Sequence, residues 1–187
     1  MAFIAGWVIA GAWTPGYSPV RQAISQLAQI GAPHRVIMTV GFVVYGLGIV
    51  VFGRWLGPLA GSRPVAWCLA LTGLATLGVA ACPLTAAGAS TQDHLHAAFA
   101  AVGYVSLAAT PVFAARAWAR SGRRVRAALS VLTGIGSAVA LAATLTGVHT
   151  GLLQRLGLTV LDVWLVAMAT SPPEVRPSYQ PGAGRKA

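Results

Sequence analysis

Residues 36–56 read VIMTVGFVVYGLGIVVFGRWL, an apolar run in which Arg54 is the only charged residue. A helix that crosses the hydrocarbon core of a bilayer needs about 20 such residues. The run therefore predicts a membrane-spanning helix. Three of its glycines, Gly41, Gly46 and Gly48, would let a second helix approach its backbone closely.

The composition of the whole chain points to the same class of protein. Of 187 residues, 56% are hydrophobic and only 9% are charged, whereas a soluble domain carries about 25% charged residues. Such a chain cannot cover a water-soluble core with polar surface, so we expect an integral membrane protein whose partner is the lipid bilayer. The net charge of +10 does not indicate nucleic acid, because the sequence contains no recognition module and no polar face that interleaves basic and aromatic residues.

Four further apolar runs predict helices, over residues 65–82, 94–118, 127–148 and 152–170. Residues 2–14 are also apolar but too short to span a bilayer upright. Three interpretations of this first segment stay open: a helix whose beginning is cut short, a tilted helix, or a signal peptide, although a positive n-region is missing. The pattern predicts an all-α bundle of about six transmembrane helices.

A short helix is expected between the first two spans, over residues 19–30. Ser18 followed by Pro19 is typical of an N-cap and a first helical position. The apolar residues Val20, Ala23, Ile24 and Leu27 fall on one face by their i, i+3, i+4, i+7 spacing. The segment is too short to span, so it is predicted to be interfacial or re-entrant.

We expect residues 1–170 to form a single transmembrane domain and residues 171–187, which are rich in proline, to be a disordered cytoplasmic tail. The predicted spans place ten of the thirteen basic residues on one side and three on the other. The larger set is Arg54, Arg63, Arg116, Arg120, Arg123, Arg124, Arg126, Arg176, Arg185 and Lys186, and the smaller set is Arg21, Arg35 and Arg155. The positive-inside rule then predicts a multi-pass plasma-membrane protein with both termini in the cytoplasm.

Residues 90–96, STQDHLH, form a polar island in this apolar chain. Asp93 lies three residues after Ser90, a spacing typical of a helix cap. Asp93 and His96 would share a helix face, where the carboxylate could orient the imidazole. His94 and His96 would point about 200° apart on a helix, so the stretch does not predict a metal site.

All four histidines fall on the predicted outer side, together with several other polar residues, which suggests a candidate site there. In an enzyme, His96 would act as base or metal ligand, Asp93 would orient it, and Ser25 or a water would attack. The candidates for binding a substrate or the phosphate of a lipid head group are Arg21, Arg35, Arg155 and Gln26, because their side chains can donate hydrogen bonds to an anion.

Asp162 is expected within the last span, where an ionised carboxylate needs a partner. Arg155 precedes it by seven residues on the same helix face and is the nearest candidate in sequence. The two form either a structural ion pair or part of a proton or substrate site.

Several stretches resemble the bacterial membrane family catalogued as domain of unknown function 998 (DUF998). They are residues 17–19 (YSP) and 23–27 (AISQL), the loop and helix start over 82–96, and residues 151–156 (GLLQRL) followed by Trp164. The resemblance covers roughly residues 7–170. It implies a six-helix membrane protein and carries no activity. This chain departs from the family in its short first helix and in Gln26, where the family often has an acidic residue.

Three functions stay open from the sequence. The first is a non-enzymatic membrane protein that binds lipid head groups or a protein partner at its outer face. The second is a membrane-embedded hydrolase or lipid-modifying enzyme acting at the outer leaflet. The third is a haem protein with two outer histidines, such as His96 and His149, as axial ligands; the sequence identifies no cofactor.

Overall fold

The computed structural model describes residues 2–170, and this part of the chain is helical apart from its connections. The elements are α1 (Ala2–Trp13), η1 (Ile24–Ala28), α2 (Arg35–Leu59), α3 (Arg63–Ala81), α4 (Thr91–Arg120), α5 (Arg124–Ala143), η2 (Thr144–Thr146) and α6 (Thr150–Thr170), where η marks a 3-10 helix. Helices α2 to α6 are long and apolar enough to cross a membrane, and α1 is apolar but shorter. The predicted all-α membrane bundle is confirmed.

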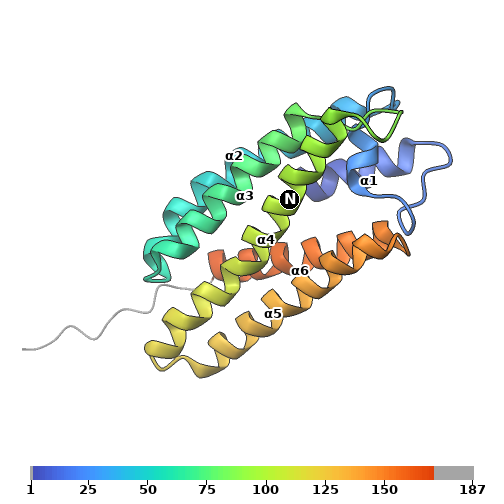
Figure 1. Ribbon diagram of the computed structural model, residues 1–187. Coiled ribbons are helices and arrows are strands. Elements are labelled where there is room, and N and C mark those ends of the chain that lie inside the picture. Colours follow the sequence, from blue (N-terminus) through green and yellow to red (C-terminus); the bar gives the residue numbers. More distant parts are fainter. Residues whose placement is uncertain (1, 171–187) are drawn as a thin grey trace, which may run out of the picture.

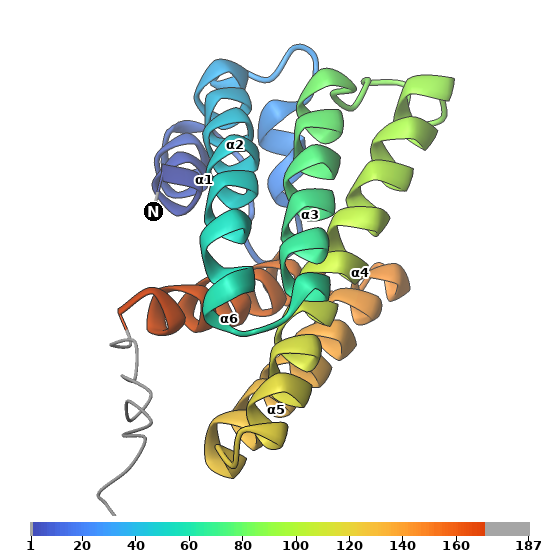
Figure 2. The same cartoon turned by 90° about the vertical axis from the view of Figure 1, so that its left-hand side faces the viewer.

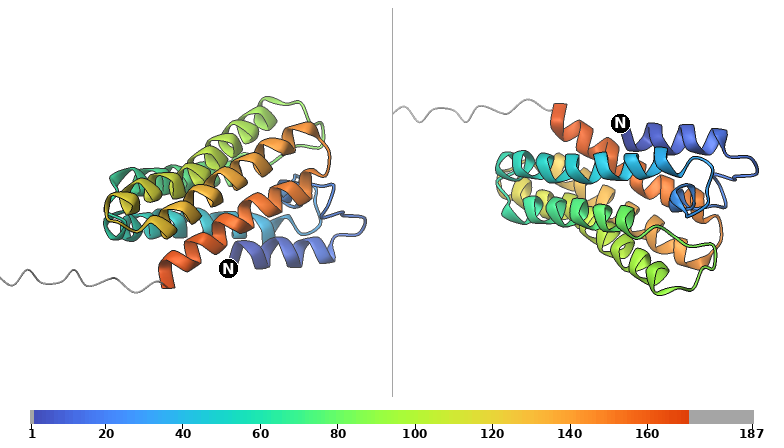
Figure 3. Two further views of the ribbon diagram at one scale, coloured as in Figure 1. Left: turned by 90° about the horizontal axis from the view of Figure 1, so that it is seen from below. Right: turned by 90° about the horizontal axis from the view of Figure 1, so that it is seen from above.

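The helices form an elongated bundle whose connections gather at two ends (Figures 1 and 3). Connections 14–34, 82–90 and 144–149 lie at one end, which we call the histidine end. Connections 60–62 and 121–123 lie at the other, the arginine end. Each helix packs on its neighbour in sequence, and Figure 2 shows α1 to α4 side by side, with α6 crossing beneath them.

Helices α2 and α3 make a close backbone contact, which glycine permits. A Cβ atom added to Gly46 would lie 2.9 Å from the carbonyl oxygen of Gly73. The close approach expected of the α2 glycines is therefore confirmed at Gly46. In contrast, a Cβ atom at Gly48 would meet nothing within 4 Å.

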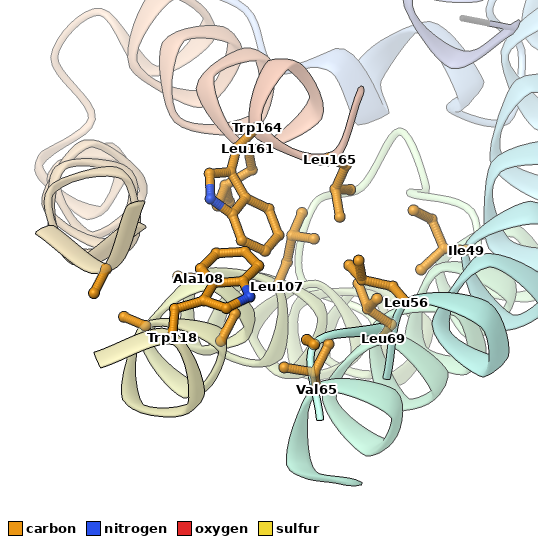
Figure 4. Packing of buried hydrophobic residues seen from close by; sticks show 14 residues of the cluster. Ile49, Leu56, Val65, Leu69, Leu107, Ala108, Trp118, Leu161, Trp164 and Leu165 are labelled. Carbon is orange, nitrogen blue, oxygen red and sulfur yellow. The ribbon is translucent and has the colours of Figure 1, made fainter. Parts of the chain in front are cut away.

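The main hydrophobic core lies where α2, α3, α4 and α6 meet (Figure 4). The rings of Trp118 on α4 and Trp164 on α6 lie with their centroids 6.0 Å apart, and both are buried. The indole Nε1 of Trp164 donates to Ser130 Oγ at 3.0 Å, which adds α5 to the contact. Burial of these large aromatic groups stabilises the half of the bundle nearer the arginine end.

The α-helix expected over residues 19–30 is replaced by the shorter 3-10 helix η1. The backbone carbonyls of Pro19 and Gln22, which an α-helix would use for its own hydrogen bonds, accept instead from the guanidinium group of Arg155. The backbone N–H of Ala23 donates to the side chain of Gln26 at 3.0 Å. Tertiary bonds have thus overridden the local helical pattern.

Two smaller differences concern helix ends. Helix α2 continues through Pro58 to Leu59, and the span expected over 127–148 ends as an α-helix at Ala143, followed by η2. The predicted tail, 171–187, lies outside the described residues.

Candidate functional site

Asp93 caps α4 with both oxygens of its carboxylate. Oδ1 accepts from the Thr85 backbone N–H at 2.7 Å, and Oδ2 accepts from the Thr85 hydroxyl, the Ser90 N–H and the Ser90 hydroxyl at 2.6, 2.8 and 2.7 Å. Ser90 Oγ in turn accepts from the Asp93 N–H at 3.2 Å, which completes a capping box. The predicted cap is confirmed, and the carboxylate is directed at the 85–90 turn.

His96 is buried one turn further along α4. Its Nδ1 lies 2.7 Å from the carbonyl oxygen of Cys82. Because a carbonyl can only accept, Nδ1 carries a proton, and in the neutral ring Nε2 then carries the lone pair. The group that orients this imidazole is therefore a backbone carbonyl at the end of α3, and the hydrogen bonds of Asp93 go to Thr85 and Ser90.

His96 and Ser25 line one small cavity near the histidine end, together with Tyr104 and Gln154. The volume of the cavity is about 50 Å³, and most of the remaining lining is apolar. A cavity of this size holds a few water molecules. Of the four residues predicted to meet beneath a common pocket, Ser25 and His96 line this cavity, whereas Asp93 and Arg155 do not.

Gln154 joins the cavity wall to the 15–30 segment, although it is not among the site residues predicted from the sequence. Its Oε1 accepts from the backbone N–H of Ile24 at 2.7 Å, and its Nε2 donates to the hydroxyl of Tyr104. One sequence feature could have indicated Gln154: it is an amide side chain next to Arg155, at the start of an apolar span where a polar group needs a partner. Its two partners, on η1 and α4, lie far from it in sequence.

Arg155 is buried beneath the 15–30 segment and binds it. Nη1 donates to the carbonyls of Pro19 at 2.8 Å and Gln22 at 3.2 Å, and to Gly151 at 3.0 Å within its own helix. Nη2 donates to the hydroxyl of Tyr17 at 2.5 Å. Arg155 thus acts as a clamp between α6 and this segment.

Aromatic rings enclose the same guanidinium group. Its carbon lies 4.9 Å from the ring centroid of Trp7 on α1 and 5.6 Å from that of Tyr17, distances that favour cation–π attraction. Burial raises the pKa of the Tyr17 hydroxyl above its usual value, and the neighbouring Arg155 acts in the opposite direction. Tyr17 therefore stays neutral, and its single hydroxyl proton is shared between the carbonyls of Gln22 and Ala23, at 3.1 and 3.0 Å.

The backbone of α6 touches the segment directly at Gly151. A Cβ atom there would lie 2.5 Å from the Pro19 carbonyl oxygen, so a side chain at this position has no room. One residue on, the N–H of Leu152 donates to the Val20 carbonyl at 2.9 Å. The GLLQRL stretch, residues 151–156, thus supplies the surface on which the 15–30 segment rests.

The other predicted binding residues are not part of this clamp. Arg21 is exposed, and Arg35 is half-buried at the start of α2. Neither guanidinium group forms a hydrogen bond or ion pair with another described residue. Gln26 has its Oε1 occupied by the N–H of Ala23, so this oxygen serves the local fold.

The remaining histidines lie apart from the cavity lining. Nε2 of His34 lies 3.1 Å from the Trp13 carbonyl oxygen, His94 is exposed, and His149 is exposed with a positive φ of 51°. Within residues 2–170, no group of three His, Cys, Asp or Glu side chains could hold a metal ion.

The ion pair considered for Arg155 and Asp162 is wrong. Asp162 Oδ1 accepts from the hydroxyl of Tyr45 on α2 at 3.0 Å, while Arg155 binds the 15–30 segment. Seven residues of helix separate the two Cα atoms by about 10 Å along the axis, and helical side chains lean towards the N-terminus. Arg155 therefore extends away from Asp162.

Comparison with known proteins identifies one family. The family described as "Protein of unknown function (DUF998)" matches residues 1–171. No curated protein and no solved structure matches the chain.

Proposed function

Since the chain belongs to the DUF998 family, for which no function is known, we propose from its own residues that it is a non-catalytic membrane protein that binds phospholipid head groups at its histidine end. The observation that carries this proposal is that two arginines at that end have guanidinium groups that pair with no described residue. The guanidinium groups of Arg21 and Arg35 have no hydrogen-bond or ion-pair partner among residues 2–170. Arginine binds phosphate through paired N–H donors.

The distribution of the carboxylates supports an external anion. The described part of the chain contains two acidic residues, and neither meets these arginines: Asp93 caps α4 and Asp162 bonds Tyr45. A phosphodiester at the membrane surface would supply the missing negative charge.

A photoactivatable phosphatidylglycerol, incorporated into nanodiscs with the protein, tests the proposal. We expect peptide mass spectrometry to find adducts in residues 14–35 that decrease several-fold in the Arg21→Gln/Arg35→Gln double variant. Adducts on residues 121–126, at the arginine end, should be unchanged and serve as the internal control. Equal adduct yields at 14–35 in both proteins would refute the proposal, and competition by free glycerol phosphate would indicate a soluble phosphate ligand in place of a lipid.

The proposal includes the orientation in the membrane, with the histidine end outside and both termini in the cytoplasm. The charges support it, because the two connections at the arginine end and the helix ends that flank them carry seven arginines, which the positive-inside rule assigns to the cytoplasm. They are Arg54, Arg63, Arg116, Arg120, Arg123, Arg124 and Arg126. In a cysteine-free variant, we expect Ala89→Cys to react with a membrane-impermeant maleimide on intact spheroplasts and Ser121→Cys to react only after lysis. The reverse result would overturn this orientation.

A hydrolase is the second candidate, because Ser25 and His96 line one cavity. Against it, that cavity of about 50 Å³ has no room for a lipid ester, and the bonds of Asp93 are directed elsewhere. A fluorophosphonate probe tests the candidate: labelling that disappears in Ser25→Ala would establish a nucleophilic serine, and we expect none.

A further inference from the structure

A second and larger cavity lies in the middle of the bundle, away from the histidine end. It is a groove of about 480 Å³ between the start of α1, α2 and the second half of α6. In Figure 3, α1 begins part-way along α2, close to α6, and residues of these three helices line the groove. Its walls are almost wholly apolar, and they include the rings of Phe3, Tyr45 and Phe52.

Asp162 is the one charged residue among the described residues that line this groove. Its Oδ1 accepts from Tyr45 at 3.0 Å, while Oδ2 accepts no hydrogen bond from residues 2–170. The nearest cation along the helix, Arg155, is engaged with the 15–30 segment. A carboxylate within a membrane-spanning helix is costly unless a cation or a proton compensates it, and no described residue of the groove lining supplies a cation.

We propose that this groove binds a lipophilic organic cation, a protonated amine with an apolar body. The ammonium group would donate to Asp162 Oδ2, and the apolar body would lie against the α2 and α6 walls. The volume lies within the range of small-molecule sites, which are mostly apolar with a few polar groups that fix orientation. Aromatic rings on the walls add cation–π attraction.

Other occupants fit these observations less well. A metal ion would need several hard ligands, and no suitable group of three acidic, histidine or cysteine side chains occurs between residues 2 and 170. An uncharged lipid chain would fill the apolar walls but would offer no hydrogen-bond donor to Asp162 Oδ2. A partner helix with a basic residue remains a distinguishable outcome of the experiment.

Equilibrium binding of a dansylated alkylamine to the full-length protein in nanodiscs tests the proposal. The neutral probe is the dansylated alcohol of the same chain length. We expect the amine to bind at least about tenfold more tightly than the alcohol, as befits one charged hydrogen bond. Asp162→Asn should remove that preference, and Asp162→Glu should keep most of it.

Two control variants keep the outcome interpretable. Val166→Trp should fill the groove and weaken binding of both probes, even if Asp162→Asn fails to fold. Ser25→Ala, in the separate cavity, should change neither affinity. Equal binding of amine and alcohol by the unmodified protein would refute the proposal. Absence of amine binding, together with a dimer that Asp162→Asn dissociates, would refute it in favour of a second copy of the chain.

Discussion

Replacement of Arg155 by glutamine should release the 15–30 segment from the bundle while the long helices stay folded. Three of the bonds of Arg155 reach that segment, at Pro19, Gln22 and Tyr17. Hydrogen bonds between elements of membrane proteins contribute about 0.6 kcal/mol each on average, and bonds to charged groups contribute about 1.5 kcal/mol or more. Because one cation serves all three acceptors, we take the loss as roughly 2–3 kcal/mol in the stability of the docked segment.

Trypsin reports this release directly, because Arg21 is exposed within the segment but cleavage requires the backbone around it to open. When opening is fast relative to cleavage, the rate follows the population of the open form. Since about 1.4 kcal/mol corresponds to a factor of ten, cleavage after Arg21 should accelerate about 30- to 150-fold in Arg155→Gln. The assay follows the appearance of the new fragment in detergent by mass spectrometry.

Arg35→Gln is the matched control, because it removes an arginine at the same end that makes no side-chain bond to a described residue. Its cleavage rate after Arg21 should equal that of the unmodified protein. Cleavage after Arg120, at the far end, monitors global unfolding and should be unchanged in both variants. An unchanged rate after Arg21 in Arg155→Gln would refute the clamp.

Further predictions concern the cap, the helix contact and the histidines. Asp93→Ala should lower the Tm by a few degrees in a thermal scan, and Asp93→Asn by less, because the amide keeps one acceptor oxygen; equal Tm values would contradict the cap. Gly46→Leu should destabilise the protein by about 1–3 kcal/mol through overpacking against α3, whereas Gly48→Leu, which faces open space, should cost little in the same denaturation assay. The purified protein should show no Soret band, since exposed His149 does not line the cavity of His96; a band lost in His149→Ala would instead establish haem binding.

Hydropathy predicted the fold well because each span depends on local composition alone. The run over residues 36–56 forms the centre of α2, and the Ser90–Asp93 cap followed from a three-residue spacing. These are short-range properties, so a single sequence contains them. The same reasoning failed at residues 19–30, where a local apolar face predicted an α-helix and a distant arginine took the carbonyls that it required.

The candidate site was less predictable because its partners are backbone atoms. The sequence predicted a carboxylate, Asp162, as the partner of Arg155. Arg155 instead binds the backbone carbonyls of Pro19 and Gln22, and every residue carries such a group. His96 is oriented by the Cys82 carbonyl for the same reason. Sequence patterns identify side-chain types, so they indicated that Ser25 and His96 lie at similar depth but not what each one touches.

The bond between Ile24 and Gln154 joins residues separated by 130 positions, which has a consequence for biosynthesis. At about 5–20 residues per second, the ribosome finishes the first partner roughly 7–26 seconds before the second. Throughout that interval the 15–30 segment remains undocked at the membrane surface. Its polar groups lack the partners that Arg155 and Gln154 later provide. The 15–30 segment can therefore dock only after α6 has been inserted. A chain that stalls before residue 150 would leave this segment accessible to membrane proteases.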